Sequence, residues 1–179
     1  MIVHETTLPG VRVLEPDRKS DERGYFARIW EPAVLAARGL NARVAQVSVS
    51  FNLRKGTLRG LHYQAAPMEE AKIVRCIRGG IFDVAVDIRP GSATCGQWVG
   101  IELSAENGRG LYIPEGFAHG FQTLVDDSEV LYFISQDYSA AHARGVRWDD
   151  PVFGIVWPDD RRTMNERDRT YPDFIIDRS

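Results

Sequence analysis

The chain has 179 residues, and its 22 Lys and Arg against 25 Asp and Glu give a formal net charge of −3 at pH 7, a balance that argues against a nucleic-acid-binding protein. No apolar run reaches the roughly 18–20 residues of a membrane helix, the first residues have neither the basic region nor the apolar core of a secretory signal, and two cysteines are too few for a disulfide scaffold. We therefore expect a single domain over residues 1–179 that is cytoplasmic and has no nucleic-acid or membrane partner.

Short runs of β-branched and aromatic residues recur along the chain, separated by Gly, Pro, Asn and Asp at turns. Such spacing is typical of an all-β sandwich or barrel rather than of alternating strands and helices. The predicted strands lie near 11–14, 25–30, 44–51, 57–64, 72–78, 81–88, 98–103, 110–113, 119–124 and 129–136. Helices are expected at 31–39, where Pro32 stands in the first turn, and near 164–169. The sequence thus predicts a β-barrel or jelly roll with short helical additions.

Polar side chains share strand faces with apolar ones at several positions. In the predicted strand 81–88, Asp83 lies on the same face as Ile81, because side chains alternate along a strand. Lys72 and Tyr132 likewise share a face with apolar neighbours in their own strands. These faces either meet solvent or line a cavity, and the strand pattern leaves both alternatives open.

Two of the four histidines, His62 and His119, stand beside glycines in strand-like runs, where a ligand or a second backbone can approach closely. With the spacing of the surrounding glycines, they follow the two-motif pattern of cupin barrels. Many cupins bind a metal through a His-x-His pair, a glutamate and a later histidine. Here Gln64 replaces the second histidine of the pair and Glu69 falls near the acidic position, and an amide is a poor ligand beside imidazole. We therefore expect neither a metal nor another cofactor.

Five segments together are more specific than these glycine patterns. Residues 56–64 read Gly-Thr-Leu-Arg-Gly-Leu-His-Tyr-Gln, residues 112–121 read Tyr-Ile-Pro-Glu-Gly-Phe-Ala-His-Gly-Phe, and shorter motifs stand at 21–26, 83–89 and 148–151. Over nearly the whole chain, these segments resemble the dTDP-4-dehydrorhamnose 3,5-epimerase family. The resemblance implies a metal-free, cupin-type jelly-roll β-barrel that forms a homodimer. It also implies epimerisation at C3 and C5 of a 4-keto-6-deoxy sugar linked to a nucleotide diphosphate.

Epimerisation next to a ketone needs a base on one face of the sugar, an acid on the other face, and a cation at the oxygen where negative charge develops. The resemblance implies that His62 is the base and that Asp168 orients and polarises it. It implies further that Tyr132 is the proton donor and that Lys72 is the cation near the keto oxygen. An imidazole suits the role of base because it titrates near neutral pH.

The resemblance also implies the substrate contacts. Arg59 is expected to hold the diphosphate, since a guanidinium fork suits phosphate, and Arg23 is expected to reach the nucleotide bound by the partner subunit. The other expected contacts are His119 at the keto oxygen, together with Gln46, Ser48, Tyr138 and Arg167. Arg59 and His62 would lie on opposite faces of a regular strand. Gly60 is therefore predicted to form a bulge that turns both toward one cavity.

The chain departs from the family pattern at two positions near the nucleotide. Ser48 stands where members usually have an amide side chain, and Arg28 stands where they usually have a glutamate. Without a carboxylate acceptor at this position, the N–H of a bound thymine is left unpaired, at a cost of roughly 1–3 kcal/mol. The proton-transfer residues are expected to be retained, while the nucleotide, the sugar and the choice between C3 and C5 are left open.

Two other functions are compatible with the same residues. A metal-dependent cupin oxygenase would use His62, Gln64, Glu69 and His119 as ligands. A non-catalytic sugar-binding barrel would keep the cavity without the proton transfer. We interpret the chain as an epimerase, because five segments in the family's order support that function.

Overall fold

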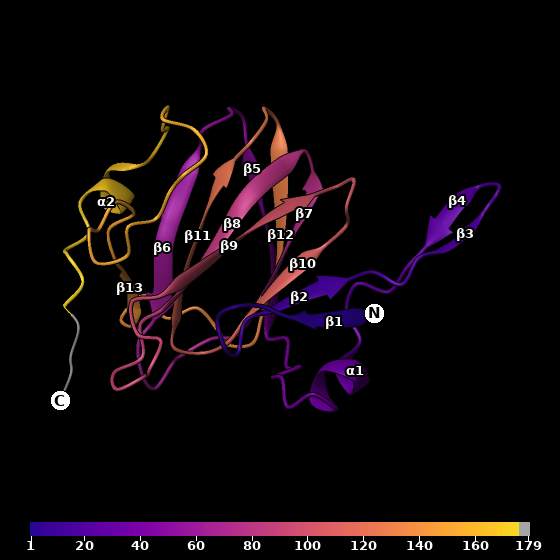
Figure 1. The fold of residues 1–179 in the computed structure, drawn as a ribbon, viewed down its shortest axis with the longest axis horizontal. Helices are drawn as coiled ribbons and strands as arrows, with labels where there is room; N and C mark the ends of the chain where they lie inside the picture. Colours follow the sequence, from indigo (N-terminus) through magenta and orange to yellow (C-terminus); the bar gives the residue numbers. More distant parts are fainter. Residues whose placement is uncertain (176–179) are drawn as a thin grey trace.

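The structure, a computed structural model, describes residues 1–175 and consists mainly of two antiparallel sheets that share one interior (Figure 1). The six-stranded sheet has the order β1 (Ile2–Glu5), β2 (Arg12–Glu15), β10 (Gly110–Ile113), β7 (Lys72–Arg78), β12 (Ser128–Ile134) and β5 (Gln46–Asn52). The five-stranded sheet has the order β13 (Ala143–Gly145), β6 (Leu58–Gln64), β11 (Phe117–Thr123), β8 (Gly80–Asp87) and β9 (Trp98–Ser104). This arrangement confirms the predicted all-β jelly roll.

Smaller elements are added to the two sheets. A hairpin of β3 (Lys19–Asp21) and β4 (Gly24–Phe26) extends away from the barrel (Figure 1), and we call it the arm. The two helices, α1 (Pro32–Ala36) and α2 (Glu166–Arg169), are short and lie within the stretches predicted to be helical. In α2 the N-cap side chain of Asn165 accepts a hydrogen bond from the Asp168 N–H (2.7 Å), which satisfies one of the free donors at the helix start.

Each of the ten predicted strands overlaps an observed one, but the prediction for 25–30 is wrong beyond Phe26. Residues 27–30 leave the arm without forming a strand, and the Ile29 carbonyl accepts a hydrogen bond from the Arg75 guanidinium (3.0 Å). The short strands β1, β3 and β13 have no alternating pattern long enough to predict them. Each forms by pairing with a neighbouring strand, which is a tertiary contact.

The alternation predicted for β8 is confirmed, and both faces of the strand are buried. Ile81 and Ala85 lie in the core between the sheets. Val84 and Val86 pack on the outer face of the five-stranded sheet, under the C-terminal part of the chain. Asp83 shares the inner face and is 0% exposed, so this carboxylate faces the protein interior and the solvent alternative does not hold.

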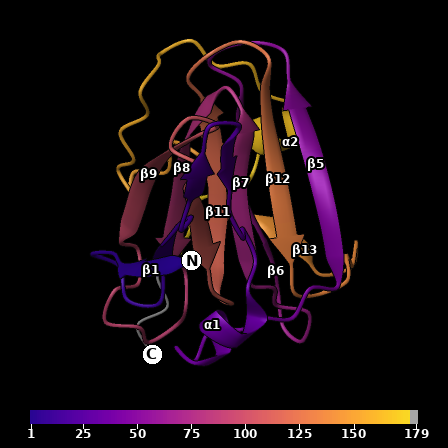
Figure 2. The same ribbon diagram turned by 90° about the vertical axis from the view of Figure 1, so that its right-hand side faces the viewer.

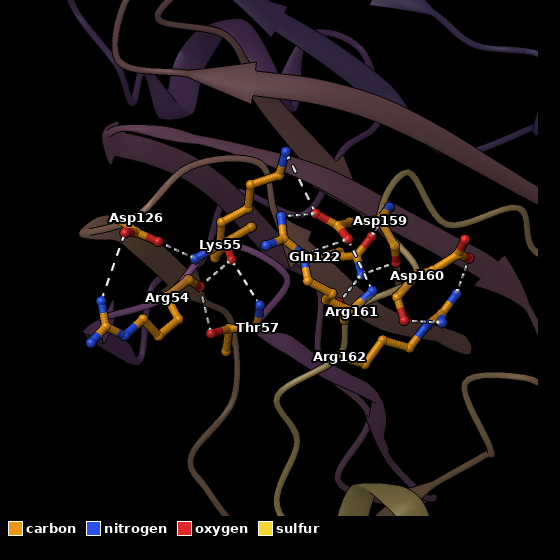
Figure 3. Close-up of polar contacts among 10 residues, drawn as sticks. Arg54, Lys55, Thr57, Gln122, Asp126, Asp159, Asp160, Arg161 and Arg162 are labelled. Carbon is orange, nitrogen blue, oxygen red and sulfur yellow. Dashed lines mark hydrogen bonds and ion pairs between the residues drawn. The ribbon is translucent and has the colours of Figure 1, made fainter.

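The C-terminal segment, residues 150–175, is fastened to the barrel by Gln122 of β11 (Figure 3). The Gln122 side chain is fully buried; its Nε2 donates to the Asp159 carbonyl (2.8 Å) and its Oε1 accepts from the Asp159 N–H (2.9 Å). Beside it, Thr57 and Thr163 form a parallel bridge. Lys55 and Arg161, which pair with Asp159, have exposed side chains, so these ion pairs stabilise little. The buried amide and the bridge therefore fix the path of the chain toward α2, which lies beside β6 (Figure 1).

The predicted bulge at Gly60 is confirmed. In the pairing of β6 with β11, His62 is opposite His119 and Arg59 is opposite Phe121, so three steps on β6 match two on β11. Gly60 has a φ of +129°, and a Cβ there would come within 2.5 Å of the Gly120 Cα. Only glycine fits this close approach, and the extra residue brings the Arg59 and His62 side chains to the same cavity.

A strained backbone dihedral costs about 1–3 kcal/mol on its own. We expect Gly60→Ala to lower the free energy of unfolding by more than this amount, because the added Cβ also clashes with the Gly120 backbone. The matched control is Gly24→Ala, because Gly24 has a φ of +128° but no atom within 4 Å of the added Cβ. Urea unfolding of the two variants measures the steric contribution of the Gly60–Gly120 contact. Equal losses in both variants would contradict the steric argument.

Candidate active site

A cavity of about 380 Å³ opens between the two sheets, and most of the predicted site residues line it. They come from neighbouring strands, namely Ser48 of β5, Arg59 and His62 of β6, Lys72 of β7, His119 of β11 and Tyr132 of β12. Tyr138 and Arg167 complete the predicted residues in the wall. The fold thus gathers at one cavity positions that run from Ser48 to Arg167 along the chain.

His62 forms a hydrogen-bonded pair with Asp168. Its Nε2 lies 2.8 Å from Asp168 Oδ1, while the Gly60 N–H donates to Asp168 Oδ2 (3.1 Å). The Asp168 side chain is 2% exposed, and burial alone would raise its pKa. The hydrogen bonds from His62 and Gly60 outweigh that effect and hold the Asp168 pKa below its ordinary value. Asp168 therefore stays ionised at neutral pH and accepts the Nε2 proton of His62.

Tyr132 packs edge to face against His119 in the cavity wall, with ring centroids 6.2 Å apart at 76°. The Tyr132 hydroxyl lies 3.3 Å from the Ser50 Oγ on the neighbouring strand. Burial raises the pKa of Tyr132 far above its ordinary value, against the Ser50 hydrogen bond, and the Asp83 charge raises it further. The phenol therefore carries its proton at neutral pH, as a proton donor requires.

His119 is held by a second carboxylate, which the sequence singled out only as part of a motif. Its Nε2 lies 2.8 Å from Asp83 Oδ1, and Asp83 is fully buried. Burial raises the pKa of Asp83, and the nearby charges of His119 and Lys72 oppose the shift. The position of Asp83 on the inner face of β8 is the sequence signal that could have identified it.

Lys72 is nearly buried and is fixed by two acceptors. Its Nζ lies 2.9 Å from Glu70 Oε1 and donates to the His62 carbonyl at 3.4 Å. Glu70 lines the cavity, whereas Glu69, which the cupin metal pattern singled out, does not. Sequence reasoning therefore did not identify Glu70, because the irregular chain between β6 and β7 gives no periodicity.

Gln64 is held by the backbone rather than directed at a ligand. Its Nε2 donates to the carbonyls of Met68 (2.9 Å) and Asp137 (3.1 Å), and its Oε1 accepts from the Ser139 N–H. Within residues 1–175, no three His, Cys, Asp or Glu side chains are grouped so that they could hold a metal ion.

Arg59 presents a guanidinium that is held at the cavity wall. Its Nε donates to the Asn52 Oδ1 (2.7 Å), and its Nη2 lies 3.4 Å from the Phe51 carbonyl. Asn52 is 1% exposed and was not predicted; it sits at the end of β5, beside β6. Arg144 and Arg167 add two more guanidinium groups to the wall. The cavity therefore offers cationic groups suited to phosphate oxygens.

Two predicted contact residues lie outside this cavity. Arg23 is on the arm, pairs with Asp21 and has 82% of its side chain exposed. Gln46 begins β5, but its amide donates to the Gln136 carbonyl (3.2 Å) and the residue does not line the cavity. The structure of one chain therefore does not bring Gln46 to the other predicted site residues.

Comparison with known proteins agrees with these observations. A family model described as dTDP-4-dehydrorhamnose 3,5-epimerase matches residues 5–175. The dTDP-4-dehydrorhamnose 3,5-epimerase of Sinorhizobium fredii is 42% identical over 173 residues, which cover 96% of this chain and 89% of that protein.

Solved structures give the same result. The dTDP-4-dehydrorhamnose 3,5-epimerase of Bacillus anthracis, with TDP and PPi bound, is 40% identical with a TM-score of 0.92, covering 96% of this chain and 98% of that one. The 3,5-epimerase of Legionella pneumophila, in complex with dTDP-4-keto-L-rhamnose, is 37% identical with a TM-score of 0.88, covering 93% and 89%.

The relatives settle the choice among the functions considered from the sequence. They share the cupin-type jelly roll and are epimerases, so they support that interpretation over a metal-dependent oxygenase or a non-catalytic sugar-binding barrel. The chain is an isomerase, and it belongs to the dTDP-4-dehydrorhamnose 3,5-epimerase family.

Proposed function

We propose that this enzyme epimerises a dTDP-linked 4-keto-6-deoxy sugar at C3 and C5, by removing a proton beside the ketone and returning one to the opposite face. The observation that carries the proposal is that His62, which is hydrogen-bonded to Asp168, and Tyr132 line the same cavity. A base and an acid that share a cavity can act on opposite faces of one bound sugar ring, which inversion requires.

His62 acts as the base in this proposal. Because Asp168 accepts the Nε2 proton, the lone pair of the neutral imidazole is on Nδ1, where a substrate proton can be taken. The ionised carboxylate then stabilises the imidazolium that forms. Positioned bases of this kind contribute about 10²–10⁴-fold to a rate.

Lys72 and His119 stabilise the enolate that proton removal creates. Both line the cavity, and the ammonium of Lys72 is fixed by Glu70 and by the His62 carbonyl before substrate binds. A preorganised cation at a developing oxyanion does not have to reorient during the reaction. Tyr132 then returns the proton to carbon, and its high pKa ensures that the phenol is protonated when it is needed.

The guanidinium groups of Arg59 and Arg167 bind the diphosphate in this proposal, and Tyr138 lies with them at the cavity wall. Ser48 lines the cavity and can replace part of the hydrogen bonding of an amide, because a hydroxyl both donates and accepts. Arg28 lies over the Phe26 ring at the end of the arm, with 5.6 Å between guanidinium and ring centroid. In this proposal Arg28 therefore affects the binding of the nucleotide that the arm contacts.

A second copy of the chain is the proposed partner. β5 is an edge strand (Figure 2), and its Val47, Val49 and Phe51 side chains are 56%, 58% and 47% exposed. The arm exposes Tyr25 and Phe26 in addition. Contiguous exposed apolar side chains on a sheet edge mark an interaction surface. In a homodimer this surface is buried, and the arm carries Arg23 toward the partner's cavity.

The proposed place of action is the cytoplasm. Within residues 1–175 no helix is long and apolar enough to cross a membrane. The proposed substrate is a charged nucleotide sugar, and the two cysteines are unpaired thiols, which suits a reducing compartment.

We expect His62→Ala to abolish solvent deuterium incorporation at C3 and C5 while substrate affinity changes little. Loss of the base removes about 10²–10⁴-fold in rate, whereas the diphosphate contacts remain. The measurement is incubation with a dTDP-4-keto-6-deoxy sugar in D₂O, with label at each carbon determined by mass spectrometry and NMR. His142→Ala is the control, because His142 hydrogen-bonds Ser139 outside the cavity. Normal exchange by the His62 variant would refute its role as base.

Tyr132→Phe is expected to slow inversion more than it slows deuterium exchange. Exchange needs only the base and return of a solvent-derived proton to the same face, whereas inversion needs the phenol on the other face. Parallel assays of exchange and of product stereochemistry give the ratio of the two rates. A similar loss of both rates would argue against Tyr132 as the proton donor.

We expect the purified protein to sediment at twice the 20.2 kDa mass of one chain, and Val47→Arg to shift it toward the monomer. A charge placed on the apolar face of β5 must be desolvated when that face is covered, which disfavours association. Val156→Arg is the matched control, since Val156 is 76% exposed away from β5. Analytical ultracentrifugation of the three proteins tests the proposal. A monomeric parent protein, or equal effects of both variants, would overturn it.

A further inference from the structure

The imidazole of His62 has a second neighbour, Tyr171, to which the function above gives no role. The two ring centroids are 5.9 Å apart, with an interplanar angle of 71°, so the rings meet edge to face. Tyr171 stands three positions after Asp168, just beyond α2. One short segment therefore supplies both the carboxylate that binds one ring nitrogen of His62 and the aromatic ring beside it.

The Tyr171 ring packs closely against one strand of the barrel. Gly145 of β13 is the register partner of His62 on β6. A Cβ at Gly145 would lie 2.3 Å from the Cζ of Tyr171 and 2.4 Å from its Cε2. The ring thus rests directly on the Gly145 backbone, next to His62. No positive φ demands glycine at this position, so the absence of a side chain serves to make room for the aromatic ring.

The ring of Tyr171, rather than its hydroxyl, makes these contacts. The Tyr171 Oη is buried and has no hydrogen-bond partner among residues 1–175. Burial raises the pKa of Tyr171, against the charge of Arg167, so the phenol is neutral. The Arg167 guanidinium lies 5.6 Å from the ring centroid. A phenylalanine would preserve the edge-to-face contact and remove a buried polar atom.

His62 needs such support because much of its side chain is open to the cavity, with 42% of its surface exposed. The hydrogen bond to Asp168 holds one atom of the ring, and rotation of the imidazole about its Cβ–Cγ bond is limited further only by groups packed against the ring. An aromatic ring packed against its side opposes that rotation. The ring plane matters because it sets the direction in which the other nitrogen can take a proton.

We propose that Tyr171 is a positioning residue for the base: together with Asp168 it fixes the plane of the His62 imidazole, and Gly145 provides the space for it. The packing of Tyr171 on His62 is present in the free enzyme. Only the expected change in rate rests on the proposed function. Tyr171 does not line the cavity, so it acts through His62 and not on the substrate.

The test compares Tyr171→Ala with Tyr171→Phe in the full chain. For Tyr171→Ala we expect kcat for exchange at both carbons to fall about tenfold or more, since small misplacements of a catalytic group are costly, with KM within about twofold of the parent enzyme. For Tyr171→Phe we expect the parent kcat, and a Tm that is equal or higher because a buried unpaired hydroxyl is removed. Loss of kcat in both variants, or in neither, would overturn the proposal.

Phe174→Ala is the matched control for loosening of the C-terminal segment. Phe174 packs on Phe153, with centroids 5.2 Å apart, and its N–H donates to Asp150. It is an aromatic residue of the same segment, but it is not in contact with His62. We expect this variant to lose stability and keep its kcat. A fall in kcat as large as that of Tyr171→Ala would mean that segment packing in general, and not the Tyr171 ring, sets the rate.

NMR of the free enzyme with ¹⁵N-labelled histidine separates this inference from the proposed function. In the parent enzyme and in Tyr171→Phe, the His62 ring protons should show nuclear Overhauser effects to residue 171 and a single sharp set of signals. In Tyr171→Ala those signals should broaden or shift. If the parent enzyme exchanges no deuterium into the sugar, the proposed function fails while this spectrum still decides the role of Tyr171. Unchanged His62 signals in Tyr171→Ala would refute it.

Discussion

The hydrogen bond between His62 and Asp168 joins two parts of the chain that are 106 residues apart, and the active site depends on it. One partner is on an inner strand, and the other is on a short helix that packs outside the five-stranded sheet. The bond can form only if the C-terminal segment follows one path over the barrel. The buried amide of Gln122 and the Thr57–Thr163 bridge set that path, so these remote contacts are part of the construction of the site.

Much of the fold could be predicted because the alternation of apolar and polar residues along a strand indicates which face is buried. The alternation along β8 gave both faces correctly, and Gly60 between Arg59 and His62 indicated the bulge, since no regular strand could direct both side chains to one cavity. The short strands β1, β3 and β13 could not be predicted in this way. Their order comes from hydrogen bonds to a neighbouring strand, which is a tertiary contact.

Most of the residues expected at the site line the cavity, whereas Arg23 and Gln46 do not, and among the supporting contacts only Asp168 was expected. His62, Lys72, His119 and Tyr132 all line the cavity as the motif resemblance implied. The other partners that hold site residues come from different strands, from the loop before β7 or from the C-terminal segment; they are Asp83, Asn52, Glu70 and Tyr171. Which side chains become neighbours is decided by sheet register and loop path, and neither is expressed in a local pattern. Glu69 and Glu70 illustrate the limit, since one position separates a residue outside the cavity from one within it.

The placement of negative charge explains how one cavity can accept an anionic substrate and still activate a base. Asp168 and Asp83 lie behind their histidines and are almost fully buried, so each interacts with an imidazole while remaining out of the cavity. Glu70 is the one carboxylate among the described lining residues, and it is neutralised by Lys72 at 2.9 Å. A diphosphate therefore meets guanidinium groups, and a developing enolate meets an ammonium and an imidazole. Asp168 and Asp83 thus each hold an imidazole through one hydrogen bond without forming part of the surface that the substrate meets.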